Sequence, residues 1–233
     1  MNLKRSLGLV AILAMVLAAP RLAAQSASQP QSAKLADSAY LALLRPLRDG
    51  GDTTVDMTAL RRAFAATSFY SPYDMDRDDQ RGQIWKRLDA HDPVAAAQIA
   101  DSLLSTNYLD FATHIGAGAA ALGHGDSSAA IRHFAVARAV IHSIESTGDG
   151  RSAEHPLFVI EPSEEYSYLS AVGLRRSGMQ SLSKCGDRAC DVLEVRARDG
   201  GQQFNLYFDV SLPMDWMTKQ FSQGEKETKP AKP

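Results

Sequence analysis

From about residue 34 to residue 147, apolar side chains recur every three or four positions, which is the spacing of helices that bury one face. The first run places Leu35, Ala39, Leu43 and Leu47 on one side of such a helix. The pattern predicts helices over 34–47, 56–67 and 76–90, followed by further helices from residue 92 onward. We therefore expect most of this part of the chain to be helical.

The helix expected over 56–67 has a marked division between its two sides. Leu60 and Phe64 share one side, whereas Arg61 and Arg62 lie on the other. Because an apolar side packs inward and charged side chains prefer water, we expect both arginines at the surface.

Two helix starts of similar design lie 34 residues apart. Asp92 precedes Pro93 and a pair of alanines, and Asp126 precedes two serines and again a pair of alanines. Aspartate is a good helix N-cap, and proline is favoured at the first helical position. A period of 34 residues is the length of a tetratricopeptide repeat, in which two antiparallel helices pack closely.

The small and aromatic positions of that repeat are also occupied. Gly118, Ala130, Phe134 and Ala137 fall at its small, small, aromatic and small positions. Over about residues 110–140 the chain resembles a tetratricopeptide unit, with a more diverged half-unit before it. An ordinary helical bundle remains the alternative, since alanine-rich helices reach such spacings by chance. With fewer than three units, any concave groove should be shallow.

The pattern changes after residue 146. Thr147-Gly148-Asp149-Gly150 ends the last long helix, with Gly148 suited to a left-handed cap. Asp199-Gly200-Gly201 is a hairpin turn signal. The pattern predicts a strand over 157–160, a helix over 163–173, strands over 191–197 and 204–210, and a short helix over 214–221.

These elements predict an α+β fold, in which N-terminal helical hairpins that are tetratricopeptide-like precede a small, mostly antiparallel three-stranded sheet with one helix. The leader and the tail have too little apolar surface to fold. The chain divides into a signal peptide (1–24), a disordered leader (25–33), a helical region (34–147), a small α+β region packed on it (148–221) and a disordered tail (222–233).

The first 24 residues have the layout of a secretory signal peptide. A short basic start is followed by an apolar run of about 13 residues and then by small residues that end at Ala24. A helix that crosses a bilayer needs roughly 20 apolar residues, so a cleaved signal is favoured over an anchor. We therefore expect an exported chain, periplasmic or secreted, with no transmembrane segment after cleavage.

The net charge argues against two classes of partner. Without Lys4, Arg5 and Arg21, 22 basic side chains face 27 acidic ones, which leaves a net charge of −5. Nucleic acids and anionic membrane surfaces both require a basic footprint. We expect a protein or peptide partner in the cell envelope, and no nucleic acid.

Cys185 and Cys190 enclose the short sequence Gly-Asp-Arg-Ala. In an exported chain a disulfide is favoured, because two thiols five positions apart around a turn can close a small loop. Two free thiols are the alternative. A structural zinc site needs four ligands, which two cysteines alone do not supply.

Histidine and serine patterns indicate no metal, no cofactor and no serine nucleophile. His114, His124, His133 and His142 lie on or beside neighbouring helices, but no pair has the i, i+4 spacing of a helical zinc site. The G-x-S-x-G pattern of serine hydrolases does not occur.

Acidic side chains flank the turn and the helix that follow residue 146. Asp149 lies in the turn, whereas Glu164 and Glu165 lie in the first turn of the helix that Ser163 should cap. The helix dipole favours acids there by about 0.3 to 1 kcal/mol each, so a helix start explains both. If the turn and the helix start converge, the same carboxylates supply an acid and a base, provided that burial raises one pKa.

Three tyrosines complete the candidate ligand-binding residues. Tyr70 and Tyr73 flank Pro72, and they form either an aromatic lip for a ligand or a turn whose rings pack over the helices. Tyr166 follows the two acids and is expected on the inward side of its helix together with Leu169.

Several short motifs also occur in the order found in one family. They are Y-S-P-Y from Tyr70, T-G-D-G-R-S-A-E from Thr147, F-V-I from Phe158, E-E-Y from Glu164, Q-S-L from Gln180, C-D-V-L-E-V from Cys190 and L-Y-F-D-V from Leu206. In these motifs the chain resembles the exported bacterial domain-of-unknown-function family 4919. The resemblance implies a signal peptide and a helical middle with a tetratricopeptide look. That family has no established activity, so the resemblance implies no reaction.

Two functional hypotheses follow. The first is a non-catalytic binding or scaffolding module of the bacterial cell envelope that recognises a protein or peptide. The alternative is a small hydrolase that uses carboxylates around Asp149 and Glu165. A hydrolase requires a deep pocket with at least one carboxylate that is buried yet unpaired, whereas acids that only start a helix should be exposed.

Overall fold

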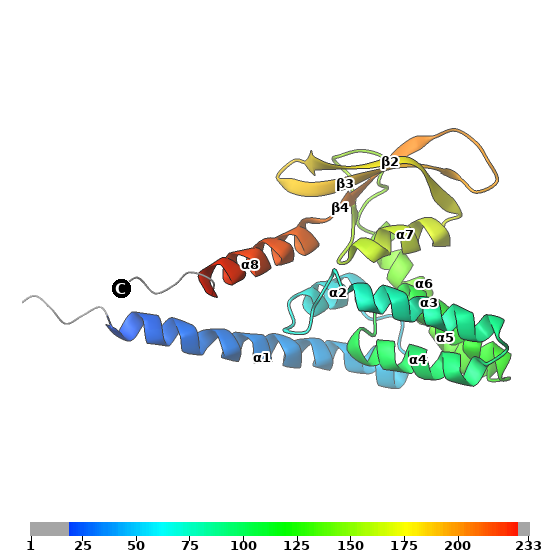
Figure 1. The fold of residues 1–233 in the computed structure, drawn as a ribbon, viewed down its shortest axis with the longest axis horizontal. Helices are drawn as coiled ribbons and strands as arrows, with labels where there is room; N and C mark the ends of the chain where they lie inside the picture. The colour runs from blue at the N-terminus through cyan, green and yellow to red at the C-terminus, as the bar shows by residue number, and fades with distance from the viewer. Residues whose placement is uncertain (1–18, 228–233) are drawn as a thin grey trace, which may run out of the picture.

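The computed structural model describes the backbone of residues 19–227 and the side chains of residues 31–222. Helices precede the sheet, so the predicted α+β class and the order of its parts are confirmed (Figure 1). The helices are α1 (Ala19–Gly50), α2 (Met57–Ala65), α3 (Met75–Asp89), α4 (Pro93–Thr106), α5 (Phe111–Gly123), α6 (Ser127–Glu145), α7 (Pro162–Ala171) and α8 (Ser211–Glu227). The strands are β1 (Leu157–Phe158), β2 (Leu174–Cys185), β3 (Arg188–Ala197) and β4 (Phe204–Asp209).

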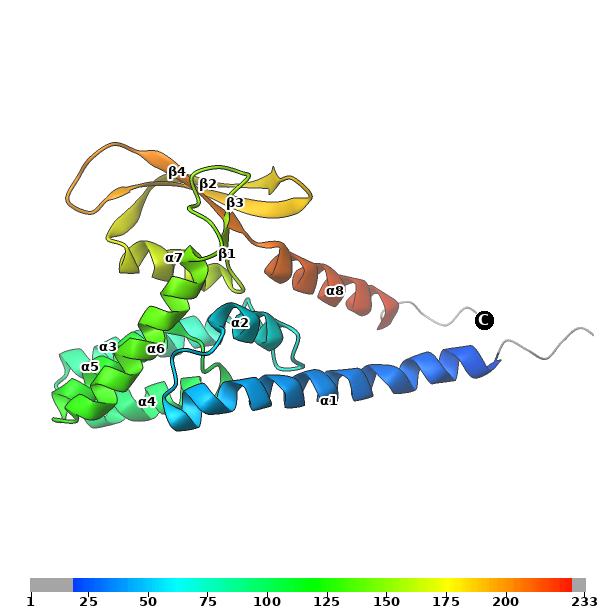
Figure 2. The same ribbon diagram turned by 180° about the vertical axis from the view of Figure 1, so that it is seen from behind.

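The structure consists of a helical layer and a sheet, with α7 between them (Figures 1 and 2). The two parts share their cores. Phe158 and Ile160 pack into the core formed by α1, α2 and α6. Ile144 of α6 packs with Leu169 of α7 and with the inner face of the sheet. The α+β part is therefore fastened to the helices by apolar side chains from both.

The sheet has four strands in the order β1-β4-β3-β2. β3 pairs antiparallel with β2 and β4, whereas β1 pairs parallel with β4. The prediction of three mostly antiparallel strands is therefore wrong, because the sheet is four-stranded and mixed. β2 escaped prediction because it is an edge strand with mostly exposed, polar side chains, and such a strand lacks the apolar alternation of a half-buried one.

Local signals place the helix starts correctly. Asp56, Asp92 and Asp126 each accept a hydrogen bond from the backbone N–H three residues further on. α5 and α6 then pack very closely, since a Cβ atom added to Gly118 would lie 2.4 Å from the Phe134 ring. The two helices expected over residues 110–140 are thus present as a packed pair.

Both ends of the described chain are helical and project from the same side of the body (Figures 1 and 2). α1 includes residues 25–33, and α8 extends into residues 222–227, although both segments were expected to lack regular structure. Residues 1–18, which hold most of the expected signal peptide, lie outside the described residues. Within residues 19–227, no helix combines the length and the apolar character needed to cross a membrane.

The turn after α6 differs from expectation in which glycine is left-handed. Gly150 has a φ of 65°, whereas Gly148 does not have a positive φ. Gly148 is required for another reason, because a Cβ atom there would lie 2.5 Å from the His155 carbonyl oxygen. The backbone at Gly148 lies directly against the backbone at His155, and only glycine permits so close an approach.

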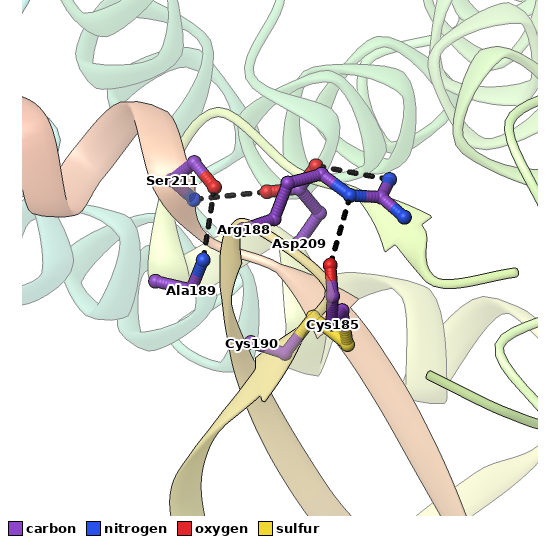
Figure 3. Close-up of a disulfide and its surroundings, with 6 residues drawn as sticks. All are labelled: Cys185, Arg188, Ala189, Cys190, Asp209 and Ser211. Atoms are coloured by element: carbon purple, nitrogen blue, oxygen red, sulfur yellow. Dashed lines mark hydrogen bonds and ion pairs between the residues drawn. A yellow bond between two sulfur atoms is a disulfide. The ribbon is translucent and has the colours of Figure 1, made fainter. Parts of the chain in front are cut away.

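The structure joins Cys185 and Cys190 in a disulfide across the β2–β3 hairpin (Figure 3). The same hairpin is tied to the start of α8. Arg188 donates to the Asp209 carboxylate at 3.4 Å, and the Ala189 N–H donates to the Ser211 hydroxyl at 3.2 Å. The disulfide therefore stiffens the end of the sheet from which α8 leaves.

Candidate functional site around helix α7

Helix α7 begins at Pro162, where three acidic side chains come together. Glu161 is the N-cap residue and has the extended backbone that is favoured before proline, but its carboxylate makes no capping bond. Ser163, which was expected to be the cap, lies inside the first turn, so that prediction is wrong. Glu164 and Glu165 lie in the first turn as expected, yet all three acids are buried. A helix start that only stabilises acids through its dipole does not require their burial.

Glu164 forms a buried ion pair with Arg61 of α2. Arg61 Nη2 lies 2.5 Å from Glu164 Oε2, and Arg61 Nε donates to Oε1 at 3.2 Å. The Ile160 N–H donates to Oε2 at 2.7 Å, and Arg61 Nη2 also donates to the Phe158 carbonyl at 3.1 Å. The expectation that Arg61 faces solvent is therefore wrong, because partners distant in sequence satisfy its charge and allow its burial. Arg62 is exposed, as expected.

Glu161 forms the second buried ion pair, with α3. Arg77 Nη1 donates to Glu161 Oε1 at 2.8 Å, and Asn107 Nδ2 donates to the same oxygen at 3.0 Å. Arg81 Nη2 lies 3.7 Å from Glu161 Oε2 and 2.6 Å from Asp110 Oδ2. Burial raises the pKa of Glu161 to about 7, while Arg77 acts in the opposite direction. The N-cap residue Glu161 and the first acid within α7, Glu164, thus fasten this helix to α3 and α2.

Glu165 differs from its neighbours because it has no cationic partner. It is completely buried, and within the described part of the chain its polar neighbour is the Asp191 carboxyl group of β3, which favours the protonated form. Burial is the largest cause that raises the pKa of Glu165 to about 9, and the nearby Asp191 of β3 and Glu164 contribute to the same shift. The side chain is therefore protonated at neutral pH, which lowers the cost of burying it. Asp191 and Glu165 add to burial in raising the pKa of Tyr73.

A pocket of about 200 Å³ opens beside the start of α7. Tyr73, Arg77, Arg81, Glu161 and Ser163 contribute to its lining. Both arginines are already ion-paired with acids, so neither guanidinium is free to hold an anionic ligand. Glu165 does not line this pocket. The ion pairs at this pocket join the start of α7 to α3.

A second pocket, which we call the aromatic pocket, lies between α3, α5 and α7 and has a volume of about 490 Å³. Trp85 and Tyr166 are each 44% exposed. The Tyr166 hydroxyl donates to Gln180 of β2 at 2.7 Å. Its lining comprises Trp85, Phe111, Ala112, Ile115, Tyr166, Ser167, Ser170 and Ala171, none of which is charged. Tyr166 was expected to face inward with Leu169, but it is exposed and lines the pocket together with Ser170 of the same helix.

The other two candidate tyrosines lie apart from the aromatic pocket. Tyr70 is buried, its hydroxyl donates to the Ile160 carbonyl, and its ring packs edge-on against Phe64 with the centroids 5.7 Å apart. Tyr73 is partly exposed and lies beside Trp216 of α8, with ring centroids 6.2 Å apart. Only one of the three tyrosines, Tyr166, is therefore part of this pocket.

Asp149 is not brought to the acids of α7. It is exposed in the turn after α6, and its carboxylate accepts a hydrogen bond from the Arg151 N–H at 2.9 Å. The charges that act on Glu165 come from Asp191 and Glu164. Asp149 therefore contributes to a turn, in the way that an Asx turn does.

Sequence reasoning missed two residues that build the aromatic pocket, Trp85 and Phe111. The available signal for Trp85 was its position in α3, a helix rich in charged residues with few apolar ones. A tryptophan on such a helix is more informative than another apolar residue in a regular stripe.

The histidines do not form a metal centre. Within the part of the chain that the structure describes, no three His, Cys, Asp or Glu side chains are grouped so as to hold a metal ion. His114 and His133 face each other with 3.0 Å between their Nδ1 atoms. Burial lowers the pKa of His114 to about 4, so this ring is neutral at pH 7.

Fold and site together define an α+β protein in which a helical region and a mixed sheet are joined through one helix that carries buried ion pairs and one wall of an aromatic pocket. The model of the family described as a domain of unknown function, DUF4919, matches residues 32–219, and the chain belongs to that family. No curated protein and no solved structure matches the chain.

Proposed function

We propose that this protein is an exported, non-catalytic binding or scaffolding module of the bacterial cell envelope, which recognises a protein or peptide through the aromatic pocket. One observation carries the proposal, namely the pair of half-exposed rings of Trp85 and Tyr166 at a pocket without charged lining. The burial of large rigid rings against a partner contributes much binding free energy. Tryptophan and tyrosine are enriched among the interface residues that dominate this energy.

The ion pairs of α7 support this role because they hold the pocket walls in place. Trp85 belongs to α3 and Tyr166 to α7, and the Arg77–Glu161 pair links these two helices directly. A pocket whose walls are already fixed loses less entropy when a ligand binds. The tetratricopeptide-like helical hairpins extend the rigid support.

Two features support an envelope location. The expected signal peptide over residues 1–24 supplies a route of export. The disulfide between Cys185 and Cys190 is of the kind that persists in oxidising compartments.

A peptide selection with matched variants tests the proposal. The chain from residue 25 onward is panned against a phage-displayed peptide library, and selected peptides are labelled for fluorescence anisotropy. We expect Trp85→Ala and Tyr166→Ala to weaken binding at least roughly tenfold, as for interface hot spots. Leu122→Ala removes an exposed apolar side chain from α5 outside the pocket and should leave the affinity unchanged. Equal binding by all four proteins would place the ligand elsewhere.

A small hydrolase that uses carboxylates around Asp149 and Glu165 is the second candidate. The raised pKa of buried Glu165 favours it, because a general acid must carry a proton at the working pH. The exposed position of Asp149 argues against the pair. Hydrolysis of p-nitrophenyl esters or glycosides by the wild type, lost in Glu165→Gln and in Asp149→Asn, would support the hydrolase. Background rates for all three proteins would argue against it.

A further inference from the structure

Two arginines lie at the edge of the aromatic pocket nearest the sheet. Arg176 of β2 donates to the Tyr166 hydroxyl at 3.4 Å, and Arg198, which follows β3, donates to the Ser170 hydroxyl at 3.0 Å. Both arginines are exposed, and both contacted hydroxyls belong to pocket-lining residues. The uncharged pocket therefore has a cationic edge.

Neither arginine is neutralised by the protein itself. Among residues 31–222, no ion pair involves Arg176 or Arg198, whereas the buried arginines of α2 and α3 pair with carboxylates. A guanidinium group has five N–H donors. Arg176 uses one of them for Tyr166, and Arg198 uses one for Ser170 and one for the Leu174 carbonyl. Both therefore keep donors for a ligand.

The two cations contact successive positions along one side of the pocket. Tyr166 and Ser170 are four residues apart in α7, which corresponds to about 6 Å along the helix axis. The Tyr166 hydroxyl donates to Gln180, whose amide in turn donates to Asp191 at 2.7 Å, so the ring is held while its oxygen accepts from Arg176. Two separate arginines favour a ligand with two carboxylates over one with a single terminal carboxylate.

We infer that the aromatic pocket binds an acidic peptide segment in which Asp or Glu side chains flank an aromatic or large aliphatic residue. The apolar side chain enters beside Trp85, Phe111 and Tyr166, and the flanking carboxylates pair with Arg176 and Arg198. Apolar burial supplies affinity, and charge-assisted hydrogen bonds supply the selectivity for acidic sequences. The inference rests on the proposed peptide-binding function and adds the charge of the ligand to it.

Matched peptides test the charge preference. The probe is the fluorescein-labelled peptide Gly-Asp-Glu-Phe-Glu-Asp-Gly with an amidated C-terminus, measured by anisotropy with the chain from residue 25 onward. We expect it to bind at least roughly tenfold more tightly than the same peptide with Asn and Gln in place of the acids, and added NaCl should reduce this preference. Replacement of Phe by Ala should also weaken binding at least roughly tenfold.

Variants of the protein test whether the two arginines cause the preference for acidic peptides. The double variant Arg176→Gln/Arg198→Gln should lose at least roughly tenfold in affinity for the acidic peptide and keep its affinity for the neutral one. Arg175→Gln removes the same charge from the same strand on its opposite face, and it should have little effect. Circular dichroism checks that each variant is folded.

The outcomes separate this inference from the function on which it rests. If library-selected peptides bind the pocket without any preference for acids, the inference is wrong and the peptide-binding function stands. If no peptide binding depends on Trp85 or Tyr166, both are wrong. If binding requires a free terminal carboxylate in place of acidic side chains, the inference as stated is overturned.

Discussion

Arg61 of α2 and Glu164 of α7 lie 103 positions apart in the sequence and form a two-pronged buried ion pair, with Arg61 Nη2 2.5 Å from Glu164 Oε2. Both side chains also bond to the backbone of the segment that leads into α7, at Phe158 and Ile160. A buried pair of this kind adds little stability compared with well-packed apolar residues, but breaking it leaves an uncompensated charge. The pair therefore determines where α7, and with it one wall of the aromatic pocket, sits on the helical region.

Removing one member of this pair should destabilise the protein strongly. Glu164→Gln leaves the Arg61 guanidinium buried without a counter-charge, and we expect the free energy of unfolding in urea to fall by about 3 to 5 kcal/mol. The control is Asp49→Asn, which breaks an exposed pair with Arg48 and should not move the unfolding midpoint measurably. Equal midpoints for the two variants would show that the buried pair does not secure α7.

Glu165 should make the folded protein less stable as the pH rises. Its pKa is raised to about 9 from an ordinary value of 4.5, so the folded chain keeps a proton that the unfolded chain loses. This contribution is complete below pH 4.5 and is lost progressively as the pH approaches 9. Glu165→Gln removes this pH dependence. The free energy of unfolding of the variant should therefore increase relative to that of the wild type by up to roughly 1.4 kcal/mol per pH unit within that window.

Urea unfolding of wild type and Glu165→Gln at several pH values between about 5 and 9 measures this effect, because the difference between the two proteins cancels the other titrating groups. Glu154→Gln changes a fully exposed acid and should run parallel to the wild type. A difference for Glu165→Gln that stays constant with pH would mean that the Glu165 pKa is not raised.

Two glycines in helices should respond in opposite directions to alanine. In Gly118→Ala the new Cβ meets the Phe134 ring at 2.4 Å, so overpacking should cost about 1 to 3 kcal/mol. Gly82 in α3 has nothing within 4 Å of such a Cβ, and Gly82→Ala should stabilise by about 0.5 to 1 kcal/mol. Thermal unfolding followed by circular dichroism compares the two. An unchanged melting temperature in Gly118→Ala would contradict the close packing of α5 and α6.

Loss of the disulfide should have a moderate effect. Cys185→Ala/Cys190→Ala opens a loop of about six residues, for which chain entropy predicts a loss of about 2 kcal/mol. Intact mass after alkylation without reductant should show no modified cysteine in the wild type. Two alkyl groups under those conditions would contradict the disulfide, and Ser183→Ala on the same strand serves as a control for unfolding.

Residues 1–24 should be removed during export. When the full chain is expressed with a C-terminal tag in a Gram-negative host, we expect the product to begin at Gln25 and to appear in the osmotic-shock fraction or the medium. Leu13→Arg places a charge in the apolar run and should leave the chain uncleaved. Intact mass distinguishes the two products. A full-length wild-type product in the cytoplasm would refute the signal peptide.

The helices and one hairpin were predictable because their signals are local. Asp92 and Asp126 bond to backbone groups three residues away, and Asp199-Gly200-Gly201 turns the chain between two adjacent strands. β2 was not predictable in this way, although its hairpin pairing with β3 is local, because its side chains are mostly exposed. A strand without an apolar face carries little periodic signal.

The candidate site was visible only in part. Tyr166 stood out beside two acids, but Trp85 and Phe111, which share its pocket, come from two other helices. Arg61 was expected in water because it lies opposite the apolar side of its helix in the sequence pattern. Its burial depends on Glu164 and on the Phe158 carbonyl, which only the folded chain brings to it.

By itself, the sequence determined the α+β class, the order of helices and sheet, and most helix starts. The tertiary structure alone decided which charged side chains are buried, which buried acid lacks a cationic partner, and which aromatic rings line one pocket. The physical reason is the separation in sequence of the groups that interact. Caps and turns act over three or four residues, whereas the burial of a charge and the pKa of a carboxyl depend on groups that folding brings together from distant parts of the chain.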